Sequence, residues 1–213
     1  MLKQILSYIY PITKKIQSKY NGVLELTWYN GYKVLNTKNT NYSYGSLQEI
    51  LDFALSKIAL DNVDKVLLLG MGGGSVIKTL RNKYHYKGLI KAVEYDEVIV
   101  EIACKEYAIC IDDLLQIITT DAFEFVANDT GKYDLIIIDL FQDNKVPKQF
   151  FSKEFIENIK LLVTNNAYFI FNLAMQDSAL DIVSLKNYFG TMFNLQLFEK
   201  VLGTNTLLIG KKL

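Results

Sequence analysis

The chain is poor in the residues that mark disulfide-rich, metal-binding and nucleic-acid-binding proteins. Its 213 residues include two cysteines, two prolines, one histidine (His85) and one arginine (Arg81). The 23 basic and 23 acidic residues give a formal net charge of zero. Such a chain lacks the positive excess and the arginine forks that bind a phosphate backbone, and His85 has no second metal ligand in a recognisable pattern. We therefore expect no nucleic-acid partner and no metal.

Long hydrophobic runs are lacking as well. The longest, such as residues 66–69 and 167–171, fall far short of the roughly 20 residues that span a bilayer. We expect a soluble protein without a membrane partner, and an N-terminus that belongs to the mature chain because it shows no cleavage site. Cys104 and Cys110 fall in one predicted helix, where the rise per residue separates them beyond the reach of a disulfide. Reduced thiols indicate a cytoplasmic protein.

Two patterns divide the chain near residue 46. Alternating apolar residues over positions 23–36 surround Asn30-Gly31, a dipeptide typical of a two-residue hairpin turn. From Leu47 onward, apolar residues first recur at helical spacing, and strand-like and helix-like segments then alternate to the end. We expect an N-terminal segment, 1–46, that holds a β-hairpin, and one α/β domain, 47–213.

Short apolar runs in the second part predict a sheet covered on both faces, and strands alternating with helices predict parallel, doubly wound strands. The last two strands are joined by only four residues, so the final strand should run antiparallel. This is the pattern of the seven-stranded, Rossmann-like sheet of class I S-adenosylmethionine-dependent methyltransferases. The predicted strands are 65–69, 89–94, 114–119, 133–139, 167–172, 193–201 and 206–210, and the predicted helices are 75–83, 96–107, 122–127, 153–162 and 178–188.

A glycine-rich loop follows the first strand of this pattern. The stretch VLLLGMGGGSVIKTL places Gly70, Gly72, Gly73 and Gly74 between a buried strand and a helix that begins at Ser75. Glycine lets backbone N–H groups approach a ligand closely, and a helix N-terminus favours electron-rich groups. We expect a cofactor at this loop. A strand-to-helix turn without a ligand is the alternative.

Acidic residues follow the next strands. Glu94 ends the second strand, where a carboxylate would accept hydrogen bonds from ribose hydroxyls, although it could instead be a charge at the start of the following helix. Asp121, followed by Ala122, opens a helix after the third strand and could receive an adenine amino group or only cap that helix. Asp139 ends the fourth strand and Asp143 lies in the loop beyond it. These two could hold an ammonium group or remove its proton, whereas a loop aspartate such as Asp143 could also serve only the turn.

At these residues the sequence resembles the spermidine synthase (polyamine aminopropyltransferase) family. The matching stretches are YSYGSLQEIL, VLLLGMGGGSVIKTL, VEYDEVIVEIACKEY, DAFEFV and KYDLIIID, in the family's order. The resemblance implies that the glycine loop and Glu94 hold decarboxylated S-adenosylmethionine, that Asp121 contacts adenine, and that Asp139 binds and deprotonates an amine acceptor. It also implies acceptor contacts at Tyr44 and Phe141, and a homodimer.

Three positions differ from the family pattern. Gly73 stands where the family has an aspartate for the aminopropyl amine, the DSSDP-like loop reads DLFQD, and the YQE or YHE motif reads YGS at Tyr44. A diamine without paired carboxylates would lose several kcal/mol to desolvation. Three alternatives therefore remain: methyl transfer from S-adenosylmethionine, a non-catalytic relative that binds a nucleoside or a protein, and an NAD-dependent oxidoreductase.

Overall fold

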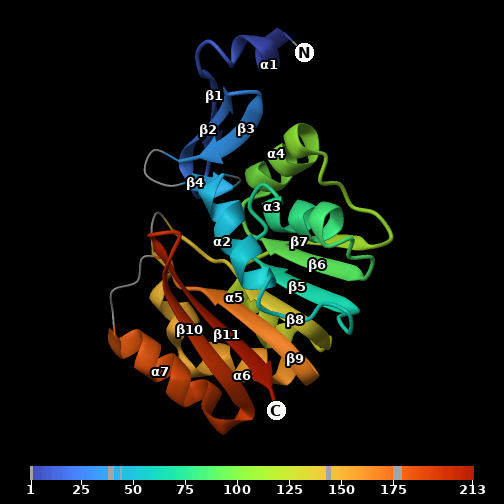
Figure 1. Cartoon of the computed structure of the whole chain (residues 1–213), viewed down its shortest axis with the longest axis vertical. Helices are drawn as coiled ribbons and strands as arrows, with labels where there is room; N and C mark the ends of the chain where they lie inside the picture. The colour runs from blue at the N-terminus through green and yellow to red at the C-terminus, as the bar shows by residue number, and fades with distance from the viewer. Residues whose placement is uncertain (1, 38–40, 44, 143–144, 175–178) are drawn as a thin grey trace.

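Two β-sheets organise the molecule, which is known from a computed structural model that describes residues 2–37, 41–43, 45–142, 145–174 and 179–213. A four-stranded sheet in the order β1-β2-β3-β4 precedes a seven-stranded sheet in the order β10-β11-β9-β8-β5-β6-β7. Figure 1 shows the small sheet and helix α1 (Leu2–Leu6) at one end of the molecule and the C-terminus at the other.

The predicted hairpin is confirmed as the centre of the small sheet. Its strands pair antiparallel up to Tyr29 opposite Tyr32, and Asn30 and Gly31 take the positive φ angles (47° and 81°) that a tight turn of this kind requires. The two flanking strands were not predicted. The first of them reads ITKKIQS, a largely exposed and polar run that lacks the apolar alternation of a strand. The strands are β1 (Ile12–Ser18), β2 (Gly22–Tyr29), β3 (Tyr32–Asn36) and β4 (Asn41–Ser43).

The seven-stranded sheet confirms the predicted fold. β5, β6, β7, β8 and β9 pair in parallel, and β11 runs antiparallel to both β9 and β10. β9 begins at Val163, four residues before the predicted start. The strands are β5 (Lys65–Leu69), β6 (Leu89–Glu94), β7 (Leu115–Thr119), β8 (Tyr133–Ile138), β9 (Val163–Asn172), β10 (Phe193–Val201) and β11 (Asn205–Lys212).

Helices cover both faces of this sheet. Because side chains alternate along β5, Val66 and Leu68 join a core with α2, α3 and α4, whereas Leu67 and Leu69 join a second core with α5, α6 and α7. The first core also takes in Leu24 and Leu35 of the small sheet, so apolar packing runs across both sheets. The helices are α2 (Ser46–Leu55), α3 (Ser75–Lys78), α4 (Glu97–Tyr107), α5 (Ala122–Asn128), α6 (Lys153–Leu162) and α7 (Ala179–Phe189).

One local prediction needs correction. Cys110 does not lie in the same helix as Cys104, because α4 ends at Tyr107 and Ala108 takes a left-handed φ of 55°. The Cys110 thiol lies 3.8 Å from the backbone oxygen of Cys104, and both cysteines are free and exposed. The predicted helix 75–83 continues beyond α3 as a π-helical turn, Thr79–Lys83.

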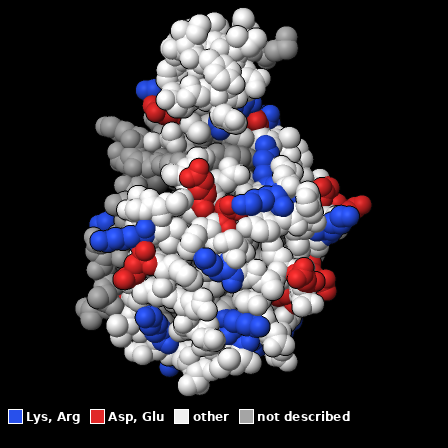
Figure 2. Space-filling model, in the orientation of Figure 1, with Lys and Arg blue, Asp and Glu red and all other residues white. Residues whose placement is uncertain are grey.

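The surface carries charges of both signs. In Figure 2, basic and acidic side chains are interspersed over the large domain, and the N-terminal end shows few of either on this face. Among the described residues, no helix is long and apolar enough to cross a membrane.

The strand order creates a switch point beside β5. From β5 the chain moves outward to β6 and β7, then returns to the other side of β5 as β8 and continues to β9. Ligands of open α/β sheets bind outside the carboxyl ends of the strands at such a reversal. The loops after β5 and β8 are therefore the place to look for a site.

Candidate active site

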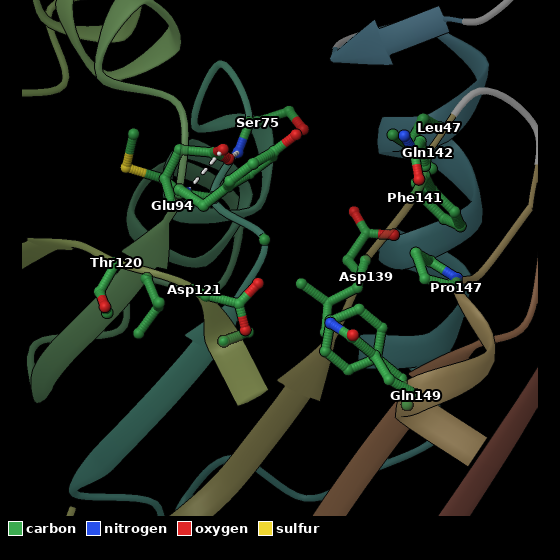
Figure 3. Close-up of a pocket in the computed structure, with 18 residues that line it drawn as sticks. Leu47, Ser75, Glu94, Thr120, Asp121, Asp139, Phe141, Gln142, Pro147 and Gln149 are labelled. Atoms are coloured by element: carbon green, nitrogen blue, oxygen red, sulfur yellow. Dashed lines mark hydrogen bonds between the residues drawn. The ribbon is translucent and has the colours of Figure 1, made fainter. Parts of the chain in front are cut away.

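A pocket opens at the carboxyl ends of β5, β6, β7 and β8. Figure 3 shows Glu94, Thr120 and Asp121 on one side, Leu47, Phe141 and Pro147 on the other, and Asp139 projecting into the space between. Its lining residues are Leu47, Gly70, Met71, Gly72, Ser75, Val93, Glu94, Tyr95, Thr120, Asp121, Ala122, Asp139, Leu140, Phe141, Gln142, Pro147, Gln149 and Phe150.

The glycine loop forms the floor of this pocket. The N–H groups of Gly70 and Met71 donate to the carbonyl of Val93 on β6 (2.9 and 3.0 Å), which fixes the loop across the strand ends. Gly70 has a φ of 86°. Gly70 and Gly72 line the pocket, whereas Gly73 and Gly74 complete the loop without lining it. A Cβ atom at Gly74 would lie 2.6 Å from the side chain of Ile109, so a larger residue would clash there.

Glu94 is buried and directed at the glycine loop. One carboxylate oxygen accepts a hydrogen bond from Gly72 N (2.9 Å), and the other accepts from Tyr95 N and Asp96 N (3.0 and 3.1 Å). Burial raises the pKa of Glu94 to about 7, and the three backbone donors offset only part of that effect. Glu94 does not cap α4, because Asp96 receives the Val98 N–H there.

Asp121 caps α5 and also lines the pocket. Its Oδ1 accepts from Phe123 N and Glu124 N (2.7 and 3.4 Å), so the capping alternative holds for this oxygen. The carboxylate is half-buried and borders the pocket together with Thr120 and the buried Ala122. Asp121 can therefore cap α5 with Oδ1 and still offer Oδ2 to a ligand in the pocket.

Asp139 stands at the switch point. Its backbone N–H donates to Leu69 O (2.9 Å), and its Oδ1 accepts from the side-chain amide of Asn172 (3.0 Å). Burial raises the pKa of Asp139 to about 7; the Asn172 hydrogen bond acts in the opposite direction, and the nearby charge of Glu94 raises it further. A carboxyl group with such a pKa is suited to take up a proton near neutral pH.

The wall beyond Asp139 is mostly apolar. Leu47 of α2, Phe141, Pro147 and Phe150 supply carbon surface, and the side chains of Gln142 and Gln149 add two amides. This wall includes Phe141, and its assignment to the acceptor stays a prediction. Tyr44 and Asp143, the other two residues assigned there from the sequence, lie outside the described residues.

Charge in the pocket is of one sign. Glu94, Asp121 and Asp139 are acidic, and no lysine, arginine or histidine is among the described lining residues. A positively charged ligand would therefore be stabilised in this pocket, while an anionic one would meet three carboxylates.

Tyr95 and Asn172 are among the lining or supporting residues that were not singled out from the sequence. Tyr95 lines the pocket, and its ring lies 4.5 Å from that of Tyr20 in the turn between β1 and β2. Asn172, at the end of β9, holds Asp139. A residue that follows a candidate ligand-binding acid, such as Tyr95, could have been suspected, but nothing in the sequence joins Asn172 to a residue 33 positions away.

Comparison with known proteins identifies the family of the chain. The family model described as "Spermine/spermidine synthase domain" matches residues 48–192. A probable polyamine aminopropyl transferase of Bifidobacterium longum is 32% identical over 125 residues, which are 58% of this chain and 27% of that protein. An eEF1A lysine and N-terminal methyltransferase of Xenopus laevis is 27% identical over 146 residues, 64% of this chain and 21% of that protein.

Solved structures share the fold. A probable spermidine synthase from Corynebacterium glutamicum superimposes with a TM-score of 0.68 and 17% identity, covering 95% of this chain and 77% of that one. Human methyltransferase-like protein 13 in complex with SAH gives a TM-score of 0.65 and 23% identity, covering 80% and 83%. The chain spans about a quarter of the length of the two curated relatives. The family model covers well over half of the chain, which therefore belongs to the spermine/spermidine synthase domain family.

Proposed function

We propose that the chain is a transferase that takes an alkyl group from an adenosyl sulfonium and joins it to an amine. One observation carries the proposal: Asp139, a half-buried carboxyl group that projects into the pocket, lies at the strand switch point, and the described charges of that pocket are all negative. Such a pocket suits two cations, the sulfonium donor and an ammonium acceptor, and the amine is the class of group named for both kinds of relative.

The donor would lie along the glycine loop. Gly70 and Gly72 line the pocket there without side chains, Glu94 would face the ribose hydroxyls, and Asp121 and Ala122 would border the adenine. Gly73 and Gly74 would complete the loop that holds the donor. The Glu94 carboxylate already accepts three backbone N–H groups, so its remaining lone pairs would receive the hydroxyls.

Transfer would be a direct displacement. The amine nitrogen attacks the carbon bound to sulfur, the new C–N bond forms as the C–S bond breaks, and the sulfur leaves as a neutral thioether. Asp139 would take the proton released by the nitrogen, helped by Asp143. The sulfonium is already a reactive electrophile, so most of the acceleration would come from alignment.

We favour the decarboxylated donor because the described pocket holds no cation to pair with the α-carboxylate of S-adenosylmethionine. Methyl transfer from S-adenosylmethionine is the second candidate, and two observations favour it. Gly73 brings no side chain toward an aminopropyl amine, and one relative is named as a lysine and N-terminal methyltransferase.

Calorimetry with four ligands tests these candidates: methylthioadenosine, decarboxylated S-adenosylmethionine, S-adenosylmethionine and NAD. We expect methylthioadenosine to bind and the decarboxylated donor to bind more tightly than S-adenosylmethionine. Tighter binding of S-adenosylmethionine than of the decarboxylated donor would favour methyl transfer. Absence of binding by every adenosyl compound would overturn it. Mass spectrometry of products formed from a mixture of amines then identifies the transferred group.

A further inference from the structure

We propose that Asn172 and Asn205 are positioning residues that hold the Asp139 carboxylate with one oxygen occupied and the other turned to the pocket. Asn205 in the C-terminal hairpin donates a hydrogen bond to Asn172 at the end of β9. Asn172 in turn donates one to Asp139, directly after β8. This inference rests on the proposed function for its catalytic meaning, but the side-chain arrangement is a property of the unliganded protein.

The central residue, Asn172, has a fixed orientation. It is fully buried, and its Oδ1 accepts two hydrogen bonds, from Asn205 Nδ2 (2.9 Å) and from the backbone N–H of Ala174 (3.1 Å). If the amide were reversed, its NH₂ group would face two donors. The oxygen must therefore point to Asn205 and Ala174, and the nitrogen must point to Asp139.

The result is an oriented donor at Asp139. Asn172 Nδ2 lies 3.0 Å from Asp139 Oδ1, and this is the side-chain hydrogen bond that the structure gives to Asp139. The bond favours the ionised form and fixes the carboxylate rotation. It also leaves Oδ2 as the atom available to a ligand that enters the pocket.

The far end of the series is anchored in the C-terminal hairpin. Backbone hydrogen bonds join Leu173 N to Thr206 O (2.9 Å) and Thr206 N to Ala174 O (2.8 Å), so the segment after β9 and the start of β11 form one unit. Asn205 lies in this unit at the start of β11. A hairpin that contributes no residue to the pocket wall thereby determines how a pocket carboxylate is presented.

The other described charged groups of the pocket do not favour the ionised form of Asp139. Among the described residues that line the pocket, the charged groups besides Asp139 are Glu94 at the end of β6 and Asp121 at the start of α5. Both are acidic, and Glu94 opposes ionisation of Asp139. The Asn172 amide is therefore the described group that favours the ionised carboxylate, and its loss should move the titration of Asp139 upward.

Carbon-13 NMR of aspartate-labelled protein, with Asp139→Asn for assignment, measures that titration without donor or acceptor. Asn172→Leu keeps the side-chain volume and removes the amide, and we expect the Asp139 midpoint to rise by about one pH unit. Asn205→Ala frees the amide to turn, and we expect a smaller rise in the same direction. Asn194→Ala, an exposed asparagine on β10, should leave the midpoint unchanged.

A second measurement on the unmodified protein covers the case in which Asn172→Leu does not fold. The side-chain amide resonances of Asn172 should shift with the same midpoint as the Asp139 carboxyl. Unchanged Asp139 titration in the folded variants, or an Asn172 amide that does not follow Asp139, would overturn the inference. If the titrations are coupled but no adenosyl compound binds, the positioning role stands and the proposed transferase does not.

Discussion

A Cβ atom at Gly70 would lie 2.1 Å from the backbone carbonyl oxygen of Asp139. The end of β5 and the end of β8 are therefore in backbone contact at the point where the glycine loop meets Asp139. This contact explains why a glycine stands there, because its φ of 86° and the absent side chain are both required.

The first prediction follows from that contact. Gly70→Ala should lower the free energy of unfolding by about 3 kcal/mol or more, because it adds a backbone clash to the strain of a left-handed residue. Gly203→Ala is the matched control: its φ is 83°, but a Cβ there would meet nothing within 4 Å, so we expect a loss of only about 1 kcal/mol. Urea denaturation measures both, and equal losses would show that the close approach is relaxed in solution.

The second prediction concerns stability and pH. The pKa of Asp139 is raised from 3.8 to about 7, so its stabilising contribution is fully present below pH 4 and is lost as the pH rises through 7. Asp139→Asn removes the buried charge, and should increase the free energy of unfolding at pH 8 by on the order of 3 kcal/mol relative to wild type. The gain should vanish near pH 4.

Thermal unfolding at pH 4, 6 and 8 checks this dependence, with the exposed Asp113→Asn as control. The same Asp139→Asn protein should still bind methylthioadenosine but transfer no alkyl group. Transfer at the wild-type rate would show that another group accepts the proton.

The third prediction concerns ligand binding and pH. Burial raises the pKa of both Glu94 and Asp139 to about 7, so the two carboxyl groups titrate near neutral pH. A cationic donor favours the ionised forms, and its affinity should therefore increase from pH 6 to pH 8, by about tenfold or more. Binding should release protons, which calorimetry in buffers of different ionisation enthalpy detects.

Neutral methylthioadenosine provides the comparison for this experiment, because it has no sulfonium charge. Its affinity should depend much less on pH. Equal pH dependence for the neutral and the cationic ligand would mean that the carboxylates do not respond to the sulfonium.

The fourth prediction concerns the contact between the small sheet and the start of α4. The buried Asp96 side chain accepts hydrogen bonds from Ser18 Oγ and Asn21 Nδ2, and Ser18 Oγ in turn accepts from Tyr20 N and Asn21 N. Ser18→Ala leaves buried partners unsatisfied and should lower the free energy of unfolding by about 2 kcal/mol. The exposed Ser56→Ala should change it by less than about 0.5 kcal/mol.

Hydrogen exchange of β1 and β2 amides locates the effect. Faster exchange confined to these strands in Ser18→Ala would show that the small sheet loosens alone. Faster donor dissociation in the same variant would show that this turn also supports Tyr95 at the pocket. Wild-type exchange and stability would mean that Asp96 finds other donors.

Sequence reasoning predicted the parts of the fold that have a strong local pattern. The run from Val66 to Leu69 and the glycines after it indicate a buried strand and a turn, and Asn30-Gly31 indicates a hairpin, because each pattern lies within a few residues. β1 was missed because Lys14 and Lys15 are exposed and polar, so its sequence lacks the apolar alternation of a strand. The predicted helix end at residue 107 agrees with α4, but the placement of Cys110 in that helix was wrong, because Ala108, a good helix former, takes a left-handed conformation there.

Some features of the candidate site could be predicted from the sequence, and others could not. Gly70, Glu94 and Asp139 follow strands in one repeating pattern, so their meeting at one edge of the sheet could be anticipated. The hydrogen bonds from Asn205 to Asn172 and from Asn172 to Asp139 could not, because each joins positions 33 residues apart. The first depends on the tertiary pairing of β9 with β11, and the second on that of β8 with β9. Glu94 was expected to face a ribose, but its bonds to three backbone N–H groups depend on the exact path of the loop.

The place of β11 between β9 and β10 bears on how the protein is made. Residues 205–212 follow the other six strands of this sheet in the sequence, yet they fill an interior position of the sheet and hold Asn172 beside Asp139. A nascent chain that ends before residue 205 has the glycine loop and every acid of the pocket but not the strand that completes the sheet. Premature termination at this point would therefore yield a product with an open sheet edge, prone to pair with other chains, instead of a slightly shorter enzyme.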